Sequence, residues 1–391
     1  MTPRSTTPTV AIVSSGLGHV ARGIETWAAD TADVLHALGH RVTLLKGSGT
    51  ASRPYERVVR CARRGGPANR LLNRLLPGPF WHVGLGSSYD IEQTSFAPHL
   101  IPRLARATDV VHTQDPLVAL ILQRARRLGL IRAPVILGHG TEEPLEWLQK
   151  IEFVQHLAPF HLEEARRAGC HRPGWTAIGN FVDTDRFRPG PAKELRSVYG
   201  LRPDSLVVLC VAAVKRHHKR ADYLVREVAR LKERSDAPVE LLVVGARTGQ
   251  TDEVMALADE LLGEAAHFLL DQPRARMPEI YRLGDVFALA SLKEMMPIAL
   301  LEAMATGLPC VVSTHPVVGW MAGSGGEPVE MEKPGALARA LTKYSDPGYR
   351  REKGAAARRE AVERFSKEAI VRKYLAMYRR VIALSNGRAT P

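Results

Sequence analysis

Cysteine is scarce in this sequence of 391 residues, and the few cysteines lie far apart. The four of them stand at positions 61, 170, 210 and 310, and none forms a C-x-x-C pair. Disulfide-rich domains and structural zinc sites need several closely spaced cysteines. The sequence therefore predicts neither, and it favours free thiols in a reducing compartment.

Long apolar runs are also absent. No segment approaches the roughly 18 uninterrupted apolar residues of a transmembrane helix. The first ten residues, MTPRSTTPTV, lack the apolar core of a secretory signal peptide. From the sequence we expect a cytoplasmic protein without a membrane-spanning helix.

Acidic residues are fewer than basic ones, 41 against 54, and the formal net charge is +13. Such an excess suits anionic partners. Zinc-finger spacing and the aromatic-basic repeat of RNA-binding sheets are missing, so we expect no nucleic-acid partner. Seven arginines lie between Arg53 and Arg74, followed by leucines. This segment leaves two readings open, a solvated helix over the core or a weak contact with the inner face of a membrane.

Short apolar runs alternate with helical segments along the chain. TVAIVSS, LVVLCVAA and VFALA are continuous rather than alternating, which is typical of strands covered by helices on both faces. The fold class is therefore α/β with parallel sheets, and the length favours two domains. A stretch rich in Asp, Arg, Gly and Pro at 180–194 separates two strand-helix series. We expect domains at 1–187 and 188–365, and a C-terminal helical segment, 366–391, that packs back on the first domain.

The stretch SLKEMMPIALLEAMATGLP, residues 291–309, sets two glutamates eight positions apart among apolar residues. It predicts a helix from Pro297 to Thr306 that ends at Gly307. Glu294 then lies at the carboxyl end of a strand, where open α/β sheets bind ligands, and the helix N-terminus suits a phosphate. Glu302 lies among apolar neighbours and needs a partner such as a ribose hydroxyl. The alternative is that both glutamates face solvent.

This stretch resembles the E-x7-E motif of retaining, nucleotide-sugar-dependent glycosyltransferases of the GT-B fold, family four. The matching residues are Glu294, Leu301, Glu302, Ala303, Met304, Ala305, Gly307, Leu308 and Pro309, whereas Met295 replaces the usual glycine. IGNFVDTDRFRP (178–189) and RGIETWAADTADVLHALGHRVTLL (22–45) resemble the family's interdomain stretch and first helix. The resemblance covers about residues 8–375 and implies two Rossmann-like parallel-sheet domains that face each other across a cleft.

The resemblance implies that the second domain binds the donor. Glu302 would bind the ribose, Glu294 the sugar, and Lys219 the diphosphate, whose developing negative charge needs fixed cations. Val214 stands where the family has an arginine, so Arg216 or Lys215 is expected to supply the second cation. The further expected donor contacts are Met295, Met296, Pro297, Ile298, Leu301, Gly245 and Lys215.

The loop SSGLGHVARG, residues 14–23, contains glycines that let backbone approach a ligand closely. Its spacing is G-x-G-x-x-x-x-G, and the second strand ends in Lys46 rather than an acidic residue. An NAD-type oxidoreductase is therefore the weaker alternative. By resemblance, the residues of this loop that contact the diphosphate or the acceptor are Gly16, Gly18, His19, Arg22 and Gly23.

His139 ends a strand of the first domain, near the point where the family has a histidine against the donor sugar. We expect it to be catalytic together with Glu294, Lys219 and Arg216, and His112 is its rival. The resemblance implies sugar transfer to an acceptor hydroxyl with retention of configuration. A nucleotide-sugar-binding protein without catalysis is a further alternative.

The D-x-D triplet Asp183–Asp185 falls in the interdomain stretch, and no cluster of metal ligands is apparent elsewhere. GT-B enzymes typically use cations and helix termini for the charge work. We therefore expect no metal and no cofactor. The acceptor, whether a small molecule, a glycan or a lipid-linked carrier, is not identified by the sequence.

Overall fold

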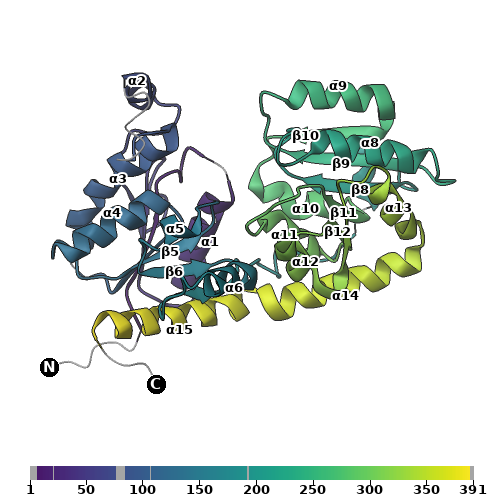
Figure 1. Cartoon of the computed structure of the whole chain (residues 1–391). Coiled ribbons are helices and arrows are strands. Elements are labelled where there is room, and N and C mark those ends of the chain that lie inside the picture. The colour runs from purple at the N-terminus through teal and green to yellow at the C-terminus, as the bar shows by residue number, and fades with distance from the viewer. Residues whose placement is uncertain (1–6, 21, 76–83, 106, 192, 388–391) are drawn as a thin grey trace. The chain divides into compact units, whose positions relative to one another are not determined.

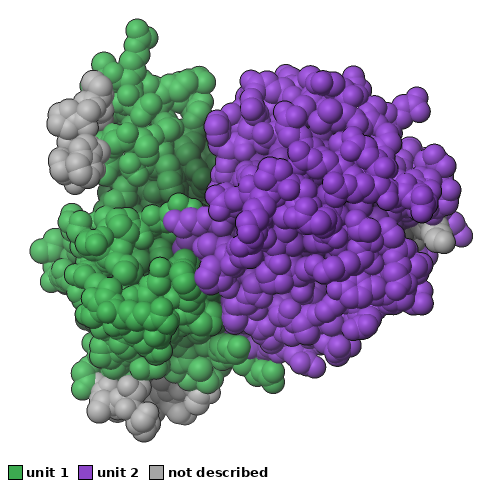
Figure 2. Space-filling model, turned by 45° about the vertical axis from the view of Figure 1, so that its right-hand side comes forward, with its two compact units in different colours: residues 1–179, 371–391 green, residues 180–370 purple. Residues whose placement is uncertain are grey.

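The structure is a computed structural model that describes residues 7–20, 22–75, 84–105, 107–191 and 193–387. The chain divides into two compact units, coloured green and purple in Figure 2. Unit 1 comprises Met1–Gly179 and Val371–Pro391, and unit 2 comprises Asn180–Ile370. Each unit has its own sheet and its own hydrophobic core.

The sheet of unit 1 has the strand order β3-β2-β1-β4-β5-β6-β7, and its neighbouring strands are parallel. The order reverses between β1 and β4, as in doubly wound folds. Most of these strands are wholly buried, which explains their continuous apolar runs. The strands are β1 (Val10–Ser14), β2 (Val42–Lys46), β3 (Glu56–Val58), β4 (Val110–Thr113), β5 (Val135–His139), β6 (Phe153–His156) and β7 (Thr176–Ala177).

Helices cover this sheet, and α3 packs against α2 and α4 (Figure 1). Apolar residues of α3, α4 and α6 form one core cluster with the strands, including Phe96, Leu122 and Leu162. The helices are α1 (Gly23–Ala37), α2 (Pro67–Leu75), α3 (Ser88–Leu104), α4 (Pro116–Arg127), α5 (Leu145–Leu148) and α6 (Pro159–Arg167).

The last helix, α15 (Lys367–Ser385), belongs to unit 1 from Val371 onward. Two of its tyrosines, Tyr374 and Tyr378, are wholly buried. The Tyr374 hydroxyl accepts a hydrogen bond from the Trp27 indole at 3.1 Å, and the Tyr378 hydroxyl lies 2.9 Å from Nδ1 of His112. The C-terminal residues therefore complete the core of the unit in which the chain begins.

The sheet of unit 2 has the order β10-β9-β8-β11-β12-β13 and is also parallel. The order reverses between β8 and β11, so the loops after these two strands lie at the switch point. The strands are β8 (Leu206–Val211), β9 (Val239–Gly245), β10 (Ala266–Leu270), β11 (Val286–Leu289), β12 (Cys310–Ser313) and β13 (Gly326–Val329).

In unit 2, α8 packs against α9 and α13, whereas α11 packs against α10 and α14 (Figure 1). Apolar residues of α8, α9 and α13 share one core cluster with the strands, among them Leu224, Val254 and Leu337. The helices are α7 (Lys193–Val198), α8 (Ala221–Lys232), α9 (Thr251–Leu262), α10 (Met277–Tyr281), α11 (Ile298–Thr306), α12 (Pro316–Ala322), α13 (Ala336–Thr342) and α14 (Pro347–Phe365).

The fold class expected from the sequence, α/β with parallel sheets, is confirmed. Helix α11 differs from its prediction by one residue, because Pro297 has an extended ψ of 117° and caps the helix instead of starting it. Its end is as predicted, with Gly307 in the left-handed region at a φ of 84°. Across the described residues, every helix is too short or too polar to cross a membrane.

Candidate active site

Two residues of the expected donor site that are 75 positions apart in the sequence meet at the carboxyl edge of the unit 2 sheet. Lys219 lies in the loop between β8 and α8, and Glu294 lies in the loop between β11 and α11. Because β8 and β11 are neighbours, these loops meet. The Lys219 ammonium contacts the Glu294 carboxylate at 2.5 Å, and the carboxylate is buried. The contact with Lys219 holds this carboxylate in one place.

A second contact links the same two loops. The imidazole Nε2 of His218 lies 3.1 Å from the backbone carbonyl oxygen of Lys293. His218 and Arg220 both have left-handed backbones, with φ of 66° and 51°. Residues other than glycine rarely adopt this backbone conformation, and those that do cluster at functional sites. Sequence reasoning missed His218, whose one signal was its place beside Lys219.

The position of the family's arginine is apolar in the structure as well. Val214 is wholly buried, and its carbonyl accepts hydrogen bonds from the hydroxyls of Thr248 and Thr251. Arg216 is half exposed and contacts Asp222 at 3.5 Å and Glu253 at 3.2 Å. In this structure the guanidinium of Arg216 therefore rests on other carboxylates and not on Glu294.

Glu302 is buried on α11, which excludes the solvent-exposed alternative. The hydroxyl of Tyr281 donates a hydrogen bond to its Oε2 at 2.9 Å. Burial, reinforced by the charge of Glu302, raises the pKa of Tyr281 well above its ordinary value, so the hydroxyl keeps its proton. The partner that the sequence required for Glu302 is present within the protein.

The other expected donor contacts fall into two groups. Met295, Pro297 and Ile298 are partly exposed around the start of α11. Met296 is buried, and its sulfur accepts a hydrogen bond from the backbone N–H of Asn180 at 3.0 Å. The buried members of this set, which also include Leu301, shape the loop from within.

Gly245 ends β9 at the same edge of the sheet. A Cβ atom at this position would lie 1.8 Å from the backbone oxygen of Ala212, which follows β8. No side chain fits there without separating the two strands. The glycine therefore allows the carboxyl ends of β8 and β9 to approach each other.

In unit 1 the glycine loop follows β1 and enters α1 at Gly23. A Cβ atom at Gly16 would lie 2.2 Å from Oε1 of Glu25, and Gly18 has a φ of 102°. Nε2 of His19 lies 2.6 Å from the Glu92 carboxylate, and the Arg22 guanidinium contacts Glu25 at 3.1 Å. The loop is therefore seated on buried carboxylates.

Three carboxylates under this loop, Glu25, Glu92 and Asp115, are almost completely buried. Arg64 joins the first two: its guanidinium contacts Glu25 at 3.3 Å and Glu92 at 2.9 Å. Tyr89 donates to Asp115 at 2.8 Å, and its ring lies 4.3 Å below the Arg64 guanidinium. The result is a connected network of carboxyl groups, Arg64 and Tyr89 at the carboxyl edge of the sheet.

The pKa values of two carboxyls in this network shift in opposite directions. Burial raises the pKa of Asp115. Burial alone would also raise the pKa of Glu92, but hydrogen bonds from Arg64 and His19 outweigh it and lower the pKa. Sequence reasoning did not identify the network. Its signals were the basic run that contains Arg64 and the stretch SSYDIEQTSFAPH (87–99), which holds Tyr89 and Glu92.

His139 ends β5, and its ring is buried. Its Nδ1 lies 3.1 Å from Nδ1 of His156, and its Nε2 lies 4.0 Å from a carboxylate oxygen of Glu143. Burial lowers the pKa of the rival, His112, to about 3, and its ring packs on Trp27 and Tyr378. His112 is therefore part of the core, whereas His139 ends a strand at the carboxyl edge of the sheet.

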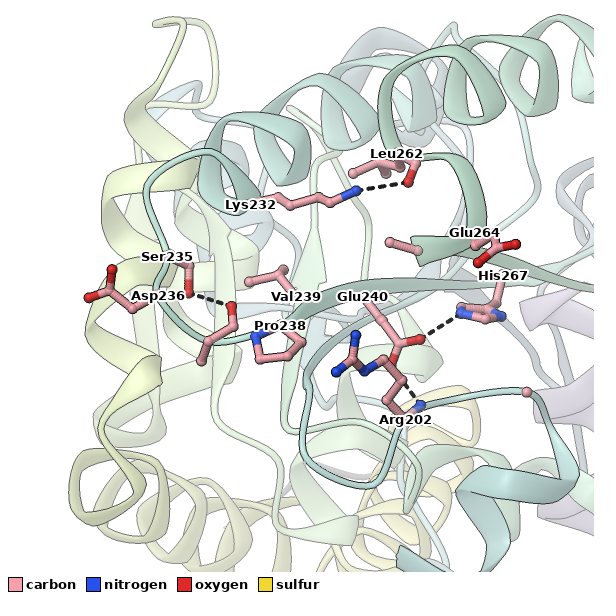
Figure 3. Close-up of a pocket in the computed structure, with 13 residues that line it drawn as sticks. Arg202, Lys232, Ser235, Asp236, Pro238, Val239, Glu240, Leu262, Glu264 and His267 are labelled. Atoms are coloured by element: carbon pink, nitrogen blue, oxygen red, sulfur yellow. Dashed lines mark hydrogen bonds and ion pairs between the residues drawn. The ribbon is translucent and has the colours of Figure 1, made fainter.

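A hollow of about 890 Å³ in unit 2 lies elsewhere, at the amino ends of β9 and β10 (Figure 3). Its polar groups bond to one another: Glu240 contacts His267 at 3.0 Å, and Lys232 donates to the Leu262 carbonyl at 3.0 Å. It contains none of the residues expected to bind the donor. Among the described residues, no three His, Cys, Asp or Glu side chains are grouped to hold a metal ion.

Comparison of the sequence with protein families gives a match to "Glycosyl transferases group 1" over residues 191–360. Among curated proteins, D-inositol 3-phosphate glycosyltransferase of Mycolicibacterium smegmatis is 29% identical over 217 residues, 53% of this chain and 47% of the relative. The enzyme of the same name from Actinosynnema mirum is 36% identical over 140 residues, 34% and 33% of the two chains. The chain spans about half the length of the curated relatives it matches.

Solved structures match over a larger part of the chain. Sucrose-phosphate synthase from Thermosynechococcus elongatus has a TM-score of 0.77 and 20% identity, covering 96% of this chain and 100% of its own. Anabaena HepE, solved with UDP and glucose, has a TM-score of 0.71 and 15% identity, covering 97% and 99%. At such identities the likeness shows the fold, which is the GT-B fold expected from the sequence.

Proposed function

We infer the function from one premise: residues 191–360 match the glycosyl transferases group 1 family. We propose that the chain transfers a sugar from a nucleoside-diphosphate sugar to an acceptor hydroxyl, with retention of configuration. The observation that carries the proposal is the contact of Lys219 with Glu294 at the switch point of the unit 2 sheet. This edge is where open α/β sheets bind nucleotides.

Lys219 is the proposed counter-charge for the leaving diphosphate. When the bond between the anomeric carbon and the phosphate oxygen breaks, that oxygen gains negative charge, and a fixed ammonium stabilises it. The N-terminus of α11, flanked by Met295 and Ile298, adds the partial positive charge of a helix end. Lys215 or Arg216 is the proposed second cation, and Arg216 would then exchange Glu253 for the diphosphate.

Glu294 and Glu302 are the proposed ligands of the donor's hydroxyls. The contact with Lys219 fixes the Glu294 carboxylate, so its remaining lone pairs suit the sugar hydroxyls. Glu302 would accept from the ribose hydroxyls while Tyr281 holds its carboxylate. His139 is proposed to contact the transferred sugar, and the loop from Gly16 to Gly23 is proposed to contact the diphosphate or the acceptor.

Retention is proposed to follow front-face attack. The bond from the anomeric carbon to the diphosphate breaks, the acceptor oxygen bonds to that carbon on the same face, and the departing phosphate takes the acceptor's proton. No resident metal or cofactor is required, because cations and helix ends do the charge work. If so, turnover stays unchanged in EDTA, and an EDTA-sensitive rate restored by Mg²⁺ would contradict this part of the proposal.

The proposed order of acceptors takes the names of the curated relatives as its starting point. They are named for D-inositol 3-phosphate, so a small polyol phosphate is the first acceptor to assay. Glycans and lipid-linked acceptors come second, and a weak membrane-surface contact of the segment at 53–74 belongs to the lipid-linked case. The proposed compartment is the cytoplasm, which suits the four free cysteines of the described structure.

Thermal unfolding with UDP, GDP, ADP, dTDP or NAD tests the proposal. A ligand that binds only the folded state increases the free energy of unfolding by mass action, by about 2.7 kcal/mol when its concentration is a hundred times Kd. The melting temperature rises accordingly. We expect one nucleoside diphosphate to stabilise the protein and the same base to support sugar transfer. Stabilisation by NAD alone would overturn the transferase reading. Nucleotide binding without turnover for any donor would indicate a binding protein that lacks catalysis.

A further inference from the structure

Two buried histidines lie side by side on neighbouring strands of unit 1. His139 ends β5 and His156 ends β6, and the two residues are paired in the parallel register. Register partners direct their side chains to the same face of a sheet. The two rings meet edge to face, with centroids 5.2 Å apart. The distance of 3.1 Å between their Nδ1 atoms is a hydrogen-bond distance.

A hydrogen bond between two imidazoles needs one Nδ1 with a proton and one without. The surroundings of His156 indicate which ring holds that proton. Its ring packs on Trp175 at 5.3 Å, and its Nε2 has no hydrogen-bond partner in the described structure, whereas Nε2 of His139 faces a carboxylate oxygen of Glu143 at 4.0 Å. A buried N–H without an acceptor is rarer than a buried acceptor without a donor. The proton of neutral His156 therefore belongs on Nδ1, where His139 accepts it.

We propose that His156 is a positioning residue that holds His139 in one orientation and one neutral tautomer, with its proton on Nε2. This proposal rests on the proposed function, in which His139 contacts the transferred sugar. With Nδ1 occupied as an acceptor, His139 offers one N–H, from Nε2, to a ligand oxygen. To charge His139, a proton would have to enter the Nδ1–Nδ1 bond, and His156 would have to move its own proton to a nitrogen without an acceptor.

The other groups around the pair are consistent with a neutral His139. Burial, with smaller contributions from His161 and His171, lowers the pKa of His156 to about 3. His161, on α6, stands edge-on to His139 at 5.5 Å, so it is the nearest competing imidazole. Glu143, in the loop after β5, faces Nε2 at 4.0 Å, and burial raises the pKa of its carboxyl. A carboxyl that resists ionisation gives an imidazolium little support.

The variants follow from this geometry. In His156→Asn, an amide N–H can take the place of the imidazole Nδ1–H and rescue the bond. In His156→Phe, the volume and the packing on Trp175 are largely kept, but the hydrogen bond is lost. His112→Phe is the matched control, because His112 is also buried, one residue before the end of β4, with a pKa of about 3, and its ring bonds Tyr378 instead.

The first measurement is the ¹⁵N spectrum of the imidazoles, with the His139 signals assigned by their loss in His139→Gln. We expect wild type and His156→Asn to show His139 as the Nε2–H tautomer across about pH 5 to 8. In His156→Phe we expect mixed tautomers and a protonation midpoint at least about one pH unit higher. A wild-type His139 that carries its proton on Nδ1 would overturn the proposal, even if His156→Phe fails to fold.

The second measurement is the pH profile of kcat/KM. We expect His156→Phe to lower kcat/KM about tenfold and to move the acid limb of the pH profile to higher pH than in wild type. His156→Asn should restore most of the activity and most of the wild-type profile. His112→Phe should lower stability and leave the profile in place. An unchanged profile in His156→Phe, together with full activity, refutes the positioning role alone. Correct tautomers in a protein without transferase activity would refute the proposed function alone.

Discussion

At the scale of single residues, the pair of Lys219 and Glu294 in the candidate site can be compared with a lysine–glutamate pair on the surface. Lys333 also pairs with a glutamate, Glu330, but both side chains are exposed on the surface. Exposed pairs contribute little free energy, whereas loss of one partner of a buried pair leaves a costly lone charge. The two lysines therefore form a matched pair for substitution.

We expect Lys219→Ala to reduce turnover at least about tenfold, because the leaving diphosphate loses a fixed positive charge. Glu294→Ala should reduce it by a similar factor, since the sugar loses a ligand that the lysine holds in place. Lys333→Ala should retain wild-type kinetics. Steady-state kinetics at saturating donor measures all three, and full activity in both site variants would refute the site assignment.

A second residue prediction concerns Glu92 and acid stability. Because the folded-state pKa of Glu92 lies below its ordinary value of 4.5, the carboxylate stabilises the folded state above that pH. The contribution disappears as the pH falls through the lowered pKa. We expect Glu92→Gln to be less stable than wild type near neutrality, and the difference to shrink below about pH 4.

Urea unfolding at a series of pH values measures this difference. Glu163→Gln is the control, since Glu163 is half exposed on α6 and contacts the arginines of its own helix. A Glu92→Gln deficit that stays constant from neutral to acid pH would show that packing, and not ionisation, is what the substitution removes.

At the scale of elements, the approach of β8 and β9 gives a sharp prediction. Gly245→Ala places a methyl group on the backbone oxygen of Ala212, so the strand ends must separate. We expect a loss of at least about 3 kcal/mol in the free energy of unfolding and weaker nucleotide binding at this edge. Gly249→Ala, in the next loop, meets no atom within 4 Å and should be nearly neutral. Chemical denaturation measures the free energy of unfolding of both variants. Equal values would show that the strand ends can separate at little cost in stability.

Most helices and strands could be predicted from the sequence, because the patterns that indicate them are local. The apolar runs predicted parallel strands, and Gly307 predicted the end of α11. Glu294 was assigned to the loop before α11 because strand and helix patterns flank it. These features depend on neighbours within a few positions of the chain.

The contacts around the site could not be predicted in the same way. Tyr281 binds Glu302 from 21 positions away, and Arg64 reaches Glu25 and Glu92 across 39 and 28 positions. Which hydroxyl or guanidinium reaches a buried carboxylate depends on packing between elements, and a single sequence does not encode it in any local pattern. For the same reason His156, 17 positions from His139, gave no signal.

At the scale of the whole molecule, unit 1 is made of two separate chain segments. Deletion of 371–391 removes the buried rings of Tyr374 and Tyr378 and leaves Trp27 and His112 without their partners. Loss of one buried aromatic ring costs about 3–5 kcal/mol, and a whole domain has about 5–15. We therefore expect the truncated protein to lose a folded unit 1 and keep a folded unit 2.

Tryptophan fluorescence and calorimetry can follow the two units separately. Trp27 and Trp175 lie in the core of unit 1, whereas Trp320 lies in unit 2 against Phe365. The single variant Tyr378→Phe, which removes only one hydroxyl, should cost about 1 kcal/mol and leave both transitions visible. A truncated protein with an intact unit 1 transition would show that α15 is dispensable for that core.

Because unit 1 is formed by the first and last segments of the chain, its folding is delayed during synthesis. The chain emerges from the ribosome with its N-terminus first, so residues 1–179 emerge long before the helix that completes their core. Unit 2 is continuous and can fold as soon as its last residues leave the exit tunnel. The segment that starts first thus finishes last, and for the time needed to translate about 190 residues it exposes the apolar surface that α15 will cover. This interval is when a nascent-chain chaperone would have the most to bind.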